Sequence, residues 1–170
     1  MSGKQRILYS FAGGDDGSYP TGLIYQSGML YGTTYIGGSA NLGTVFSVDP
    51  GTGAELVLHS FAKKHDGAEP IAAPFYLNGA LFGTTQSGGR NDMGSLFTVN
   101  PTTGVESVIY SFGAAVPNAL NPNSPLVYQH GKFYGTTYVG GTENHGTIQC
   151  RSCYRAWGGV LQLPRWRRWA

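Results

Sequence analysis

The sequence predicts an all-β protein built from tandem copies of one small antiparallel sheet. A Gly-Thr-Thr motif preceded by apolar or aromatic residues recurs roughly every 50 residues, an interval typical of repeat architectures. Glycine, at 27 of 170 residues, is about twice its usual share of roughly 7%. Apolar segments are short and are separated by Gly, Pro, Asn and Asp, which favours strands joined by tight turns over helices.

Each copy contains the same submotifs in the same order. The central motif lies at residues 30–34, 81–85 and 133–137. A Gly-Gly pair follows each copy, and a Gly-x-apolar segment follows the pair. Because separate submotifs recur in a fixed order, the repeat predicts one structural unit used three times.

The first elements of the unit are a strand and a polar loop. Residues 7–11 predict a short strand that recurs at 57–61 and 108–112, and the loop at 13–17 recurs at 63–67. A proline then precedes the next strand in each copy, at Pro20, Pro70 and Pro122. Proline suits the entry of a strand because it lacks the N–H that a central ladder needs.

A hairpin and two further strands complete the unit. Asn78-Gly79 separates two apolar runs and predicts a tight hairpin turn, with Ser27-Gly28 and His130-Gly131 at the corresponding places. In the first copy, residues 44–48 predict the third strand, 49–53 a Pro-Gly turn and 55–58 the fourth strand. Each period therefore contains four short antiparallel strands.

Four-stranded units at this spacing are typical of the blades of a β-propeller. We expect three blades, at about residues 7–56, 57–107 and 108–148, followed by an irregular tail at 149–170. Propellers typically close with four to eight blades. Three blades leave the ring open, so self-association through the open blade edges is expected.

The same submotifs, from Leu-Tyr-Gly-Thr-Thr to Gly-Thr-Val-Phe-Ser-Val-Asp-Pro and Ser-Phe, resemble the GloVer tandem repeat of bacterial extracellular proteins over residues 7–148. The resemblance implies a kelch-like propeller repeat from a secreted or surface-anchored protein, with no known catalytic residues. It also implies an extracellular or cell-surface location. The chain itself shows no signal peptide, because the apolar run after its basic start is too short.

The segment at 149–170 differs from the rest of the chain. It contains five arginines, both cysteines and all three tryptophans, whereas all nine acidic residues precede it. Reading the gene one nucleotide later from Ile148 permits an Asp-Pro turn, a Ser-Phe strand and a Gly-Asp-Gly loop in their expected order. We therefore interpret the tail as an out-of-frame segment and Cys150 with Cys153 as an accidental pair, and sequencing the gene beyond this point tests the interpretation.

Candidate binding residues follow each Gly-Thr-Thr motif. Tyr35, Gln86 and Tyr138 occupy one position of the repeat and predict an aromatic rim for sugars. Asp15, Asp16 and Asp66 lie in glycine-rich loops and are weak calcium candidates, for which turn stabilisation is the alternative. The paired threonines are interpreted as structural, because they occur in every copy. No catalytic residue, metal site or cofactor is predicted.

The sequence predicts a non-enzymatic extracellular repeat module that acts in binding, adhesion or structure. Carbohydrate or protein at the cell surface is the expected partner, and no specific nucleic acid is expected. Two alternatives stay open: a fragment of a propeller enzyme acting on carbohydrate, and a cationic tail that binds anionic membranes through its alternating Arg and Trp residues. Deletion of residues 149–170 followed by vesicle binding separates the tail from the propeller surface.

Overall fold

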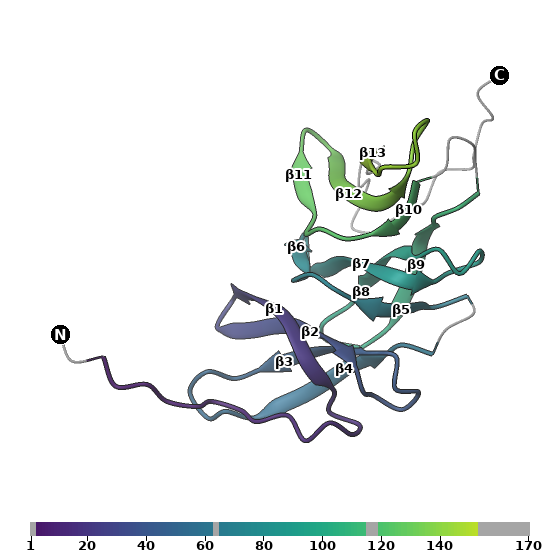
Figure 1. Ribbon diagram of the computed structural model, residues 1–170. Helices are drawn as coiled ribbons and strands as arrows, with labels where there is room; N and C mark the ends of the chain where they lie inside the picture. Colours follow the sequence, from purple (N-terminus) through teal and green to yellow (C-terminus); the bar gives the residue numbers. More distant parts are fainter. Residues whose placement is uncertain (1–2, 63–64, 115–118, 153–170) are drawn as a thin grey trace.

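The computed structural model describes residues 3–62, 65–114 and 119–152, and all regular structure within these ranges is β (Figure 1). The strands form three antiparallel sheets that follow one another along the chain. Figure 1 shows them stacked face over face, from the first sheet at the bottom to the third at the top. No helix able to cross a membrane occurs among the residues that the structure describes.

Each sheet corresponds to one copy of the repeat. The first contains, in spatial order, β1 (Ser18–Gln26), β2 (Met29–Ile36), β3 (Thr44–Val48) and β4 (Glu55–Ser60). The second contains β5 (Gly67–Pro70), β6 (Phe75–Leu77), β7 (Ala80–Gly88), β8 (Ser95–Val99) and β9 (Glu106–Ser111), with β5 and β6 both paired to β7. The third contains β10 (Ala119–Pro122), β11 (Val127–Gln129), β12 (Lys132–Gly140) and β13 (Thr147–Ser152).

The predicted hairpins are confirmed at all three places. Ser27, Asn78 and His130 have φ values of 51°, 49° and 49°, and a positive-φ glycine follows each. Two successive residues with positive φ form the type I′ turn, whose twist matches that of the flanking strands. The repeat therefore fixes the register of each hairpin through its turn.

The predicted strand at residues 7–11 is wrong, because this segment is extended but belongs to no sheet. Its counterparts at 57–60 and 108–111 are the fourth strands β4 and β9, which pair with β3 and β8. A fourth strand needs the third strand of its own sheet, and no sheet precedes the first among the described residues. Phe11 nevertheless packs edge-on against Phe46, with ring centroids 5.0 Å apart, as Phe61 packs against Phe97.

The third sheet continues past residue 148, the expected end of the last repeat. Strand β13 pairs with β12 from Thr147 to Ser152. Residues 149–152, which the sequence assigns to the tail, therefore form the second half of a strand. The rest of the predicted tail lies outside the described residues.

The core lies between the first two sheets. Its buried cluster consists of Val45, Phe61, Leu81, Phe97 and Val99. Val45 lies on β3 and Phe61 directly follows β4 of the first sheet, whereas the other three residues lie on β7 and β8 of the second sheet. Neither sheet can bury this surface alone, so each sheet depends on its neighbour, as in other repeat proteins.

A glycine in the central strand of each sheet faces a residue on the third strand. Gly32 pairs with Phe46, and Gly83 pairs with Phe97. A Cβ at Gly83 would overlap the ring of Phe97, so this position needs glycine for a steric reason. In the third sheet the partner of Gly135 is Gln149, and a small pocket lined by Phe112, Gly135 and Gln149 among others lies at this place.

The second threonine of each pair has a structural role, as the sequence predicts. Its Oγ1 is shared with a hydroxyl on the next strand, in Thr34–Thr44 (2.9 Å), Thr85–Ser95 (2.8 Å) and Thr137–Thr147 (2.7 Å). It also donates to a backbone carbonyl two residues further along the chain. These bonds satisfy a polar group inside the sheet, which would otherwise cost about 1–3 kcal/mol.

Neighbouring sheets are linked by a backbone bond at the same position of the repeat. The Glu69 N–H donates to the Leu42 carbonyl (2.8 Å), and the Asn121 N–H donates to the Met93 carbonyl (2.9 Å). The first threonine of the pair adds a further link, because Thr33 Oγ1 donates to the Ala72 carbonyl (2.9 Å). The equivalent Thr136 in the third sheet is exposed and bonds within its own repeat, to Asn123.

Candidate functional site

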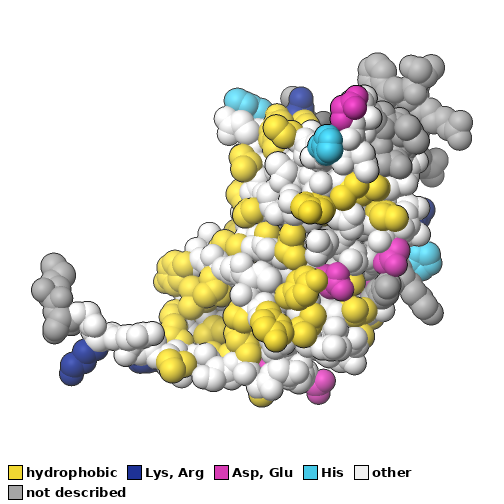
Figure 2. Space-filling model, in the orientation of Figure 1, with side chains coloured by type: hydrophobic (Ala, Val, Ile, Leu, Met, Phe, Trp, Pro, Cys, Tyr) yellow, Lys and Arg dark blue, Asp and Glu magenta, His cyan; other side chains and the backbone are white. Residues whose placement is uncertain are grey.

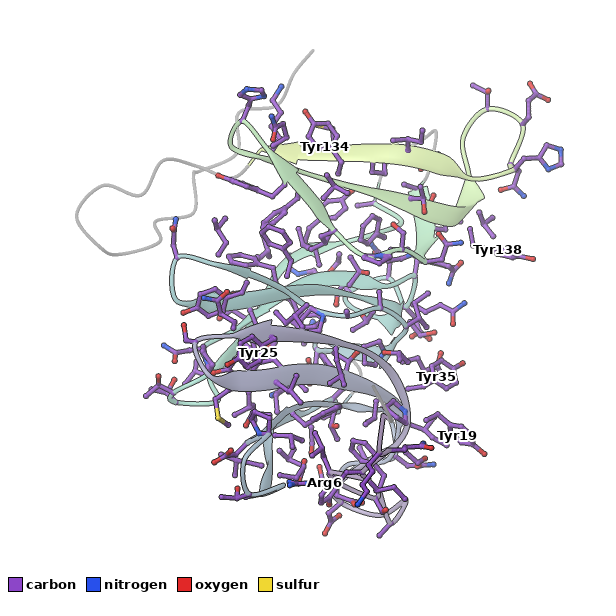
Figure 3. The ribbon with its side chains drawn as sticks, turned by 90° about the vertical axis from the view of Figure 1, so that its left-hand side faces the viewer. Arg6, Tyr19, Tyr25, Tyr35, Tyr134 and Tyr138 are labelled. Atoms are coloured by element: carbon purple, nitrogen blue, oxygen red, sulfur yellow. The ribbon has the colours of Figure 1, made fainter. Side chains whose placement is uncertain are left out.

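The predicted rim residues lie along one edge of the stacked sheets. Figure 3 shows Tyr35 and Tyr138 projecting from the same side of the molecule, together with Tyr19. Tyr138 is exposed, and Tyr35 is half-buried at the end of β2. Tyr25 projects from the opposite edge, near the hairpin turn (Figure 3). The edge that carries the Gly-Gly loops is therefore rich in accessible tyrosine.

Polar groups of the second repeat continue this edge between the tyrosines. The backbone carbonyl of Gln86 accepts a bond from Asn121 Nδ2 (3.0 Å), so the second and third sheets are joined at this point. The Glu69 carboxylate accepts a bond from Ser87 Oγ (2.7 Å). Tyrosine rings beside fixed amide and carboxylate groups are suited to bind sugars or protein side chains. We call the edge formed by Tyr19, Tyr35, Gln86 and Tyr138 the tyrosine edge.

The three calcium candidates lie in two different loops and do not form one site. Asp15 is exposed, whereas Asp16 is tied to its own loop. Asp16 Oδ2 accepts bonds from the Tyr9 hydroxyl (2.8 Å) and the Ala12 N–H (2.7 Å). The Ala12 bond is the main reason that the pKa of Asp16 is lowered. Asp66 has the same place in the second repeat, so the turn-stabilising interpretation accounts for both residues.

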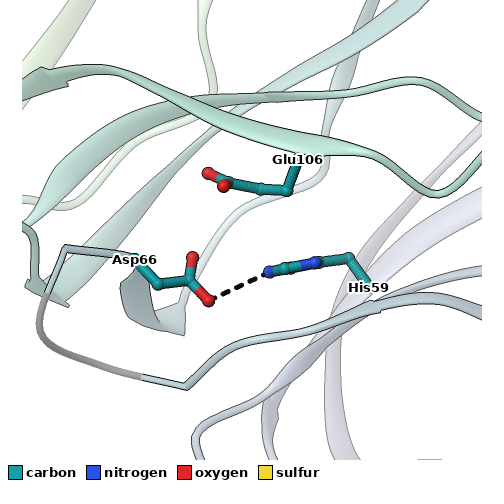
Figure 4. Close-up of side chains that lie close together, drawn as sticks. All are labelled: His59, Asp66 and Glu106. Carbon is teal, nitrogen blue, oxygen red and sulfur yellow. Dashed lines mark hydrogen bonds and ion pairs between the residues drawn. The ribbon is translucent and has the colours of Figure 1, made fainter.

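A second group of titratable side chains lies in the second repeat. His59, Asp66 and Glu106 come together from β4, the following loop and β9 (Figure 4). His59 Nε2 and Asp66 Oδ2 are 3.1 Å apart, and one ligand atom from each of the three residues lies within 4.8 Å of the others. All three side chains are half-buried. We call these residues the His59 cluster.

The electrostatics of the His59 cluster are dominated by Glu106. Its Oε1 is buried and has no hydrogen-bond partner among the described residues. Burial first, and then the nearby Asp66 charge, raise the pKa of Glu106 to about 7, and His59 opposes this rise in part. The carboxyl groups of Asp66 and Glu106 therefore lie close together. The buried oxygen of Glu106 has neither a hydrogen-bond donor nor a cation beside it among the described residues.

The first repeat contains the corresponding group with tyrosine in place of histidine. The hydrogen bond to Asp16 raises the pKa of Tyr9 to about 12. Glu55 corresponds to Glu106, and burial raises its pKa as well. His59 of the second repeat therefore corresponds to Tyr9 of the first repeat. The signal was present, because Tyr9, His59 and Tyr110 each stand two residues before the Phe of a Ser-Phe pair.

Of the two cysteines, Cys150 is the one that lies among the described residues. Cys150 lies on β13 as an exposed free thiol. Cys153 and the Arg-Trp segment lie outside the described residues, so the expectations for the tail are left as sequence predictions.

Comparisons with solved structures show where similar folds occur. A chain of the nidogen/laminin complex has a TM-score of 0.55 at 13% identity, covering 79% of this chain and 44% of that one. A puromycin hydrolase mutant has a TM-score of 0.50 at 16% identity, covering 78% and 20%. TolB from Acinetobacter baumannii has a TM-score of 0.47 at 14% identity, covering 74% and 27%. This chain thus spans less than half the length of each matched chain, and the comparison with curated proteins found no match.

The likenesses with TM-scores of 0.55 and 0.50 concern the fold alone. Together with three stacked antiparallel sheets that form no closed ring among the described residues, they define the protein as a partial β-propeller made of tandem repeats. The chain belongs to the Gloeobacter/Verrucomicrobia repeat family, whose model matches residues 1–154. The family expected from the sequence is therefore confirmed.

Proposed function

We propose that this repeat module is a non-enzymatic binding module of a secreted or cell-surface protein, and that its ligand is a carbohydrate. The observation that carries the proposal is the tyrosine edge, where Tyr35 and Tyr138 project to the same side from two different sheets (Figure 3). Aromatic faces stack on the apolar faces of sugar rings, and a row of them suits an extended ligand. The location rests on the family resemblance, and fractionation of cells expressing the complete gene tests it.

A protein ligand is the second candidate. It is favoured by the likeness to a chain from a complex of nidogen with laminin, and tyrosine is enriched at protein interfaces. The enzyme alternative has weaker support. The carboxylate pair Asp66 and Glu106 recurs as Asp16 and Glu55 in the preceding repeat, whereas a catalytic site needs one repeat to differ from the others.

Replacing Tyr138 with alanine is expected to weaken binding to an immobilised polysaccharide about tenfold, because one aromatic contact contributes roughly 1–1.5 kcal/mol. A glycan array identifies the polysaccharide, and titration calorimetry measures the affinity. Tyr25→Ala is the matched control, since Tyr25 is 66% exposed and Tyr138 is 67% exposed. Equal losses in both variants, or no glycan bound at all, would contradict the carbohydrate proposal.

The exposed outer faces of the first and third sheets support a second partner, which is another copy of the same chain. Ile148 is 82% exposed, whereas the equivalent Val45 and Leu96 are 0% and 4% exposed because the next sheet covers them. Val127 lies on the same sheet and is also exposed. At the other end, Leu23 and Tyr25 of the first sheet are exposed. Figure 2 shows hydrophobic side chains gathered on the lower part of the molecule, where the first sheet lies. The end sheets thus carry apolar positions that neighbouring sheets cover inside the chain.

Ile148→Asp is expected to shift the chain from oligomer to monomer, because burying an unpaired carboxylate between two sheets is strongly unfavourable. Light scattering coupled to size exclusion at several protein concentrations measures the change. Val105→Asp is the control, since Val105 is exposed but lies beside a turn of the second sheet. A wild-type chain that stays monomeric at ~100 µM would refute this second partner.

A further inference from the structure

We propose that His59, Asp66 and Glu106 bind one divalent transition-metal ion of the zinc class. The ligand set is one imidazole and two carboxylates, which is a set that zinc accepts. It has too few oxygen atoms for calcium, which takes six to eight oxygen ligands. With three protein ligands, the fourth position is left for water or for a group of the bound ligand.

The spacing of the ligand atoms is close to what one ion needs. Two ligands at about 2.0–2.1 Å from the same zinc ion are at most roughly 4.2 Å apart. The three atoms already lie within 4.8 Å of one another. The ligand atoms that are furthest apart therefore have to move closer before all three bind one ion.

Two of the ligands are held in place by their surroundings. Asp66 accepts a bond from the Ala62 N–H at Oδ2 (2.9 Å) and from the Gly67 N–H at Oδ1 (2.7 Å). The His59 ring packs edge-on against Phe61, with centroids 4.9 Å apart. Groups that orient the ligands in this way strengthen metal binding, because less freedom is lost when the ion enters.

The third ligand, Glu106, has a buried carboxylate oxygen available to bind an ion, as Glu55 has in the first repeat. Glu106 Oε1 is buried without a hydrogen-bond partner among the described residues, and an unpaired buried carboxylate oxygen is unfavourable. Figure 4 shows the Glu106 carboxylate beside the His59–Asp66 pair. A cation between the three side chains would neutralise both carboxylates.

Comparison with the first repeat shows what makes the second one suitable. There Tyr9 donates its hydroxyl proton to Asp16 (2.8 Å) and occupies the place of the imidazole. A neutral phenol is a poor ligand at neutral pH, whereas imidazole binds zinc through a ring nitrogen. In the first repeat the phenol therefore occupies this position with a hydrogen bond to Asp16, whereas in the second repeat an imidazole nitrogen is placed beside the two carboxylates.

Protons compete with the metal ion for the same ligand atoms. His59 Nε2 and Asp66 Oδ2 form one hydrogen bond in the metal-free protein, and the ion would take both atoms as ligands. Metal affinity is consequently expected to fall as the pH is lowered.

The experiment uses the full chain with Cys150→Ser and Cys153→Ser, because the thiols of the tail also bind zinc. After treatment with EDTA, zinc chloride is titrated at pH 7.5 by calorimetry. One ion per chain with a Kd below about 10 µM is expected, and the affinity is expected to fall when the titration is repeated at pH 6. Cobalt(II) in place of zinc is expected to give the visible absorption of a low-coordinate site.

His59→Tyr is the decisive variant, because it installs the residue that the first repeat carries at this place. It is expected to fold and to bind zinc at least tenfold more weakly. Glu106→Gln keeps the size of the side chain and is expected to lose a similar factor. His65→Ala is the control, since His65 is exposed and outside the cluster, and it should bind as the parent does. No zinc binding at 100 µM, or unchanged binding in both His59→Tyr and Glu106→Gln, would overturn the proposal.

Discussion

Phe97→Ala is expected to lower the free energy of unfolding by about 3–5 kcal/mol, the usual cost of removing a buried phenylalanine. Phe97 is 0% exposed and lies at the centre of the cluster between the first two sheets. Its ring packs against Phe61 at 5.0 Å and covers Gly83. The truncated side chain would leave a cavity against a glycine, which has no side chain to fill it.

Urea denaturation followed by far-UV circular dichroism measures this loss. Val105→Ala is the control, because Val105 is exposed on the same repeat and its loss should stay within about 0.5 kcal/mol. A loss below about 1 kcal/mol in Phe97→Ala would mean that the first two sheets do not share a packed core.

Gln149→Phe is expected to raise the free energy of unfolding by about 1–2 kcal/mol, somewhat less than the full burial of a phenylalanine. Gln149 stands where the first two repeats have Phe46 and Phe97, opposite Gly135. The pocket at this place is lined by Phe112, Leu96 and Phe133, among others. A ring there would pack on Phe112 as the ring of Phe97 packs on Phe61.

Ile148, next to Gln149 on β13, provides the control for the expected gain in stability. Ile148 points to the open side of the third sheet, so Ile148→Phe should leave the stability within about 0.5 kcal/mol. Thermal unfolding of both variants beside the parent compares the two faces of β13. Equal effects at 148 and 149 would show that the third sheet does not repeat the packing of the second.

Local chemistry explains why much of the fold could be predicted. A Gly after Ser27, Asn78 and His130 sets each hairpin turn, because the turn requires two residues with positive φ. The alternation of apolar residues then places one face of each strand against the next sheet. These features need only neighbouring residues, so each copy of the motif carries them.

The prediction failed where an element depends on a partner from elsewhere. The sequence of residues 7–11 is that of a fourth strand. Among the described residues, however, no third strand lies beside this segment. The His59 cluster was missed for a related reason, since His59 and Glu106 are far apart in the sequence and meet only when two sheets stack. Nothing local to His59 shows that a carboxylate will be its neighbour.

The sequence by itself determined the number of repeats, the hairpin turns and most of the strands, because these follow from residues close together along the chain. The tertiary structure decided which surfaces are covered and which titratable groups meet. Burial and proximity arise only when sheets from different repeats pack, so Val45 is buried and Ile148 exposed although both occupy the same position of the repeat.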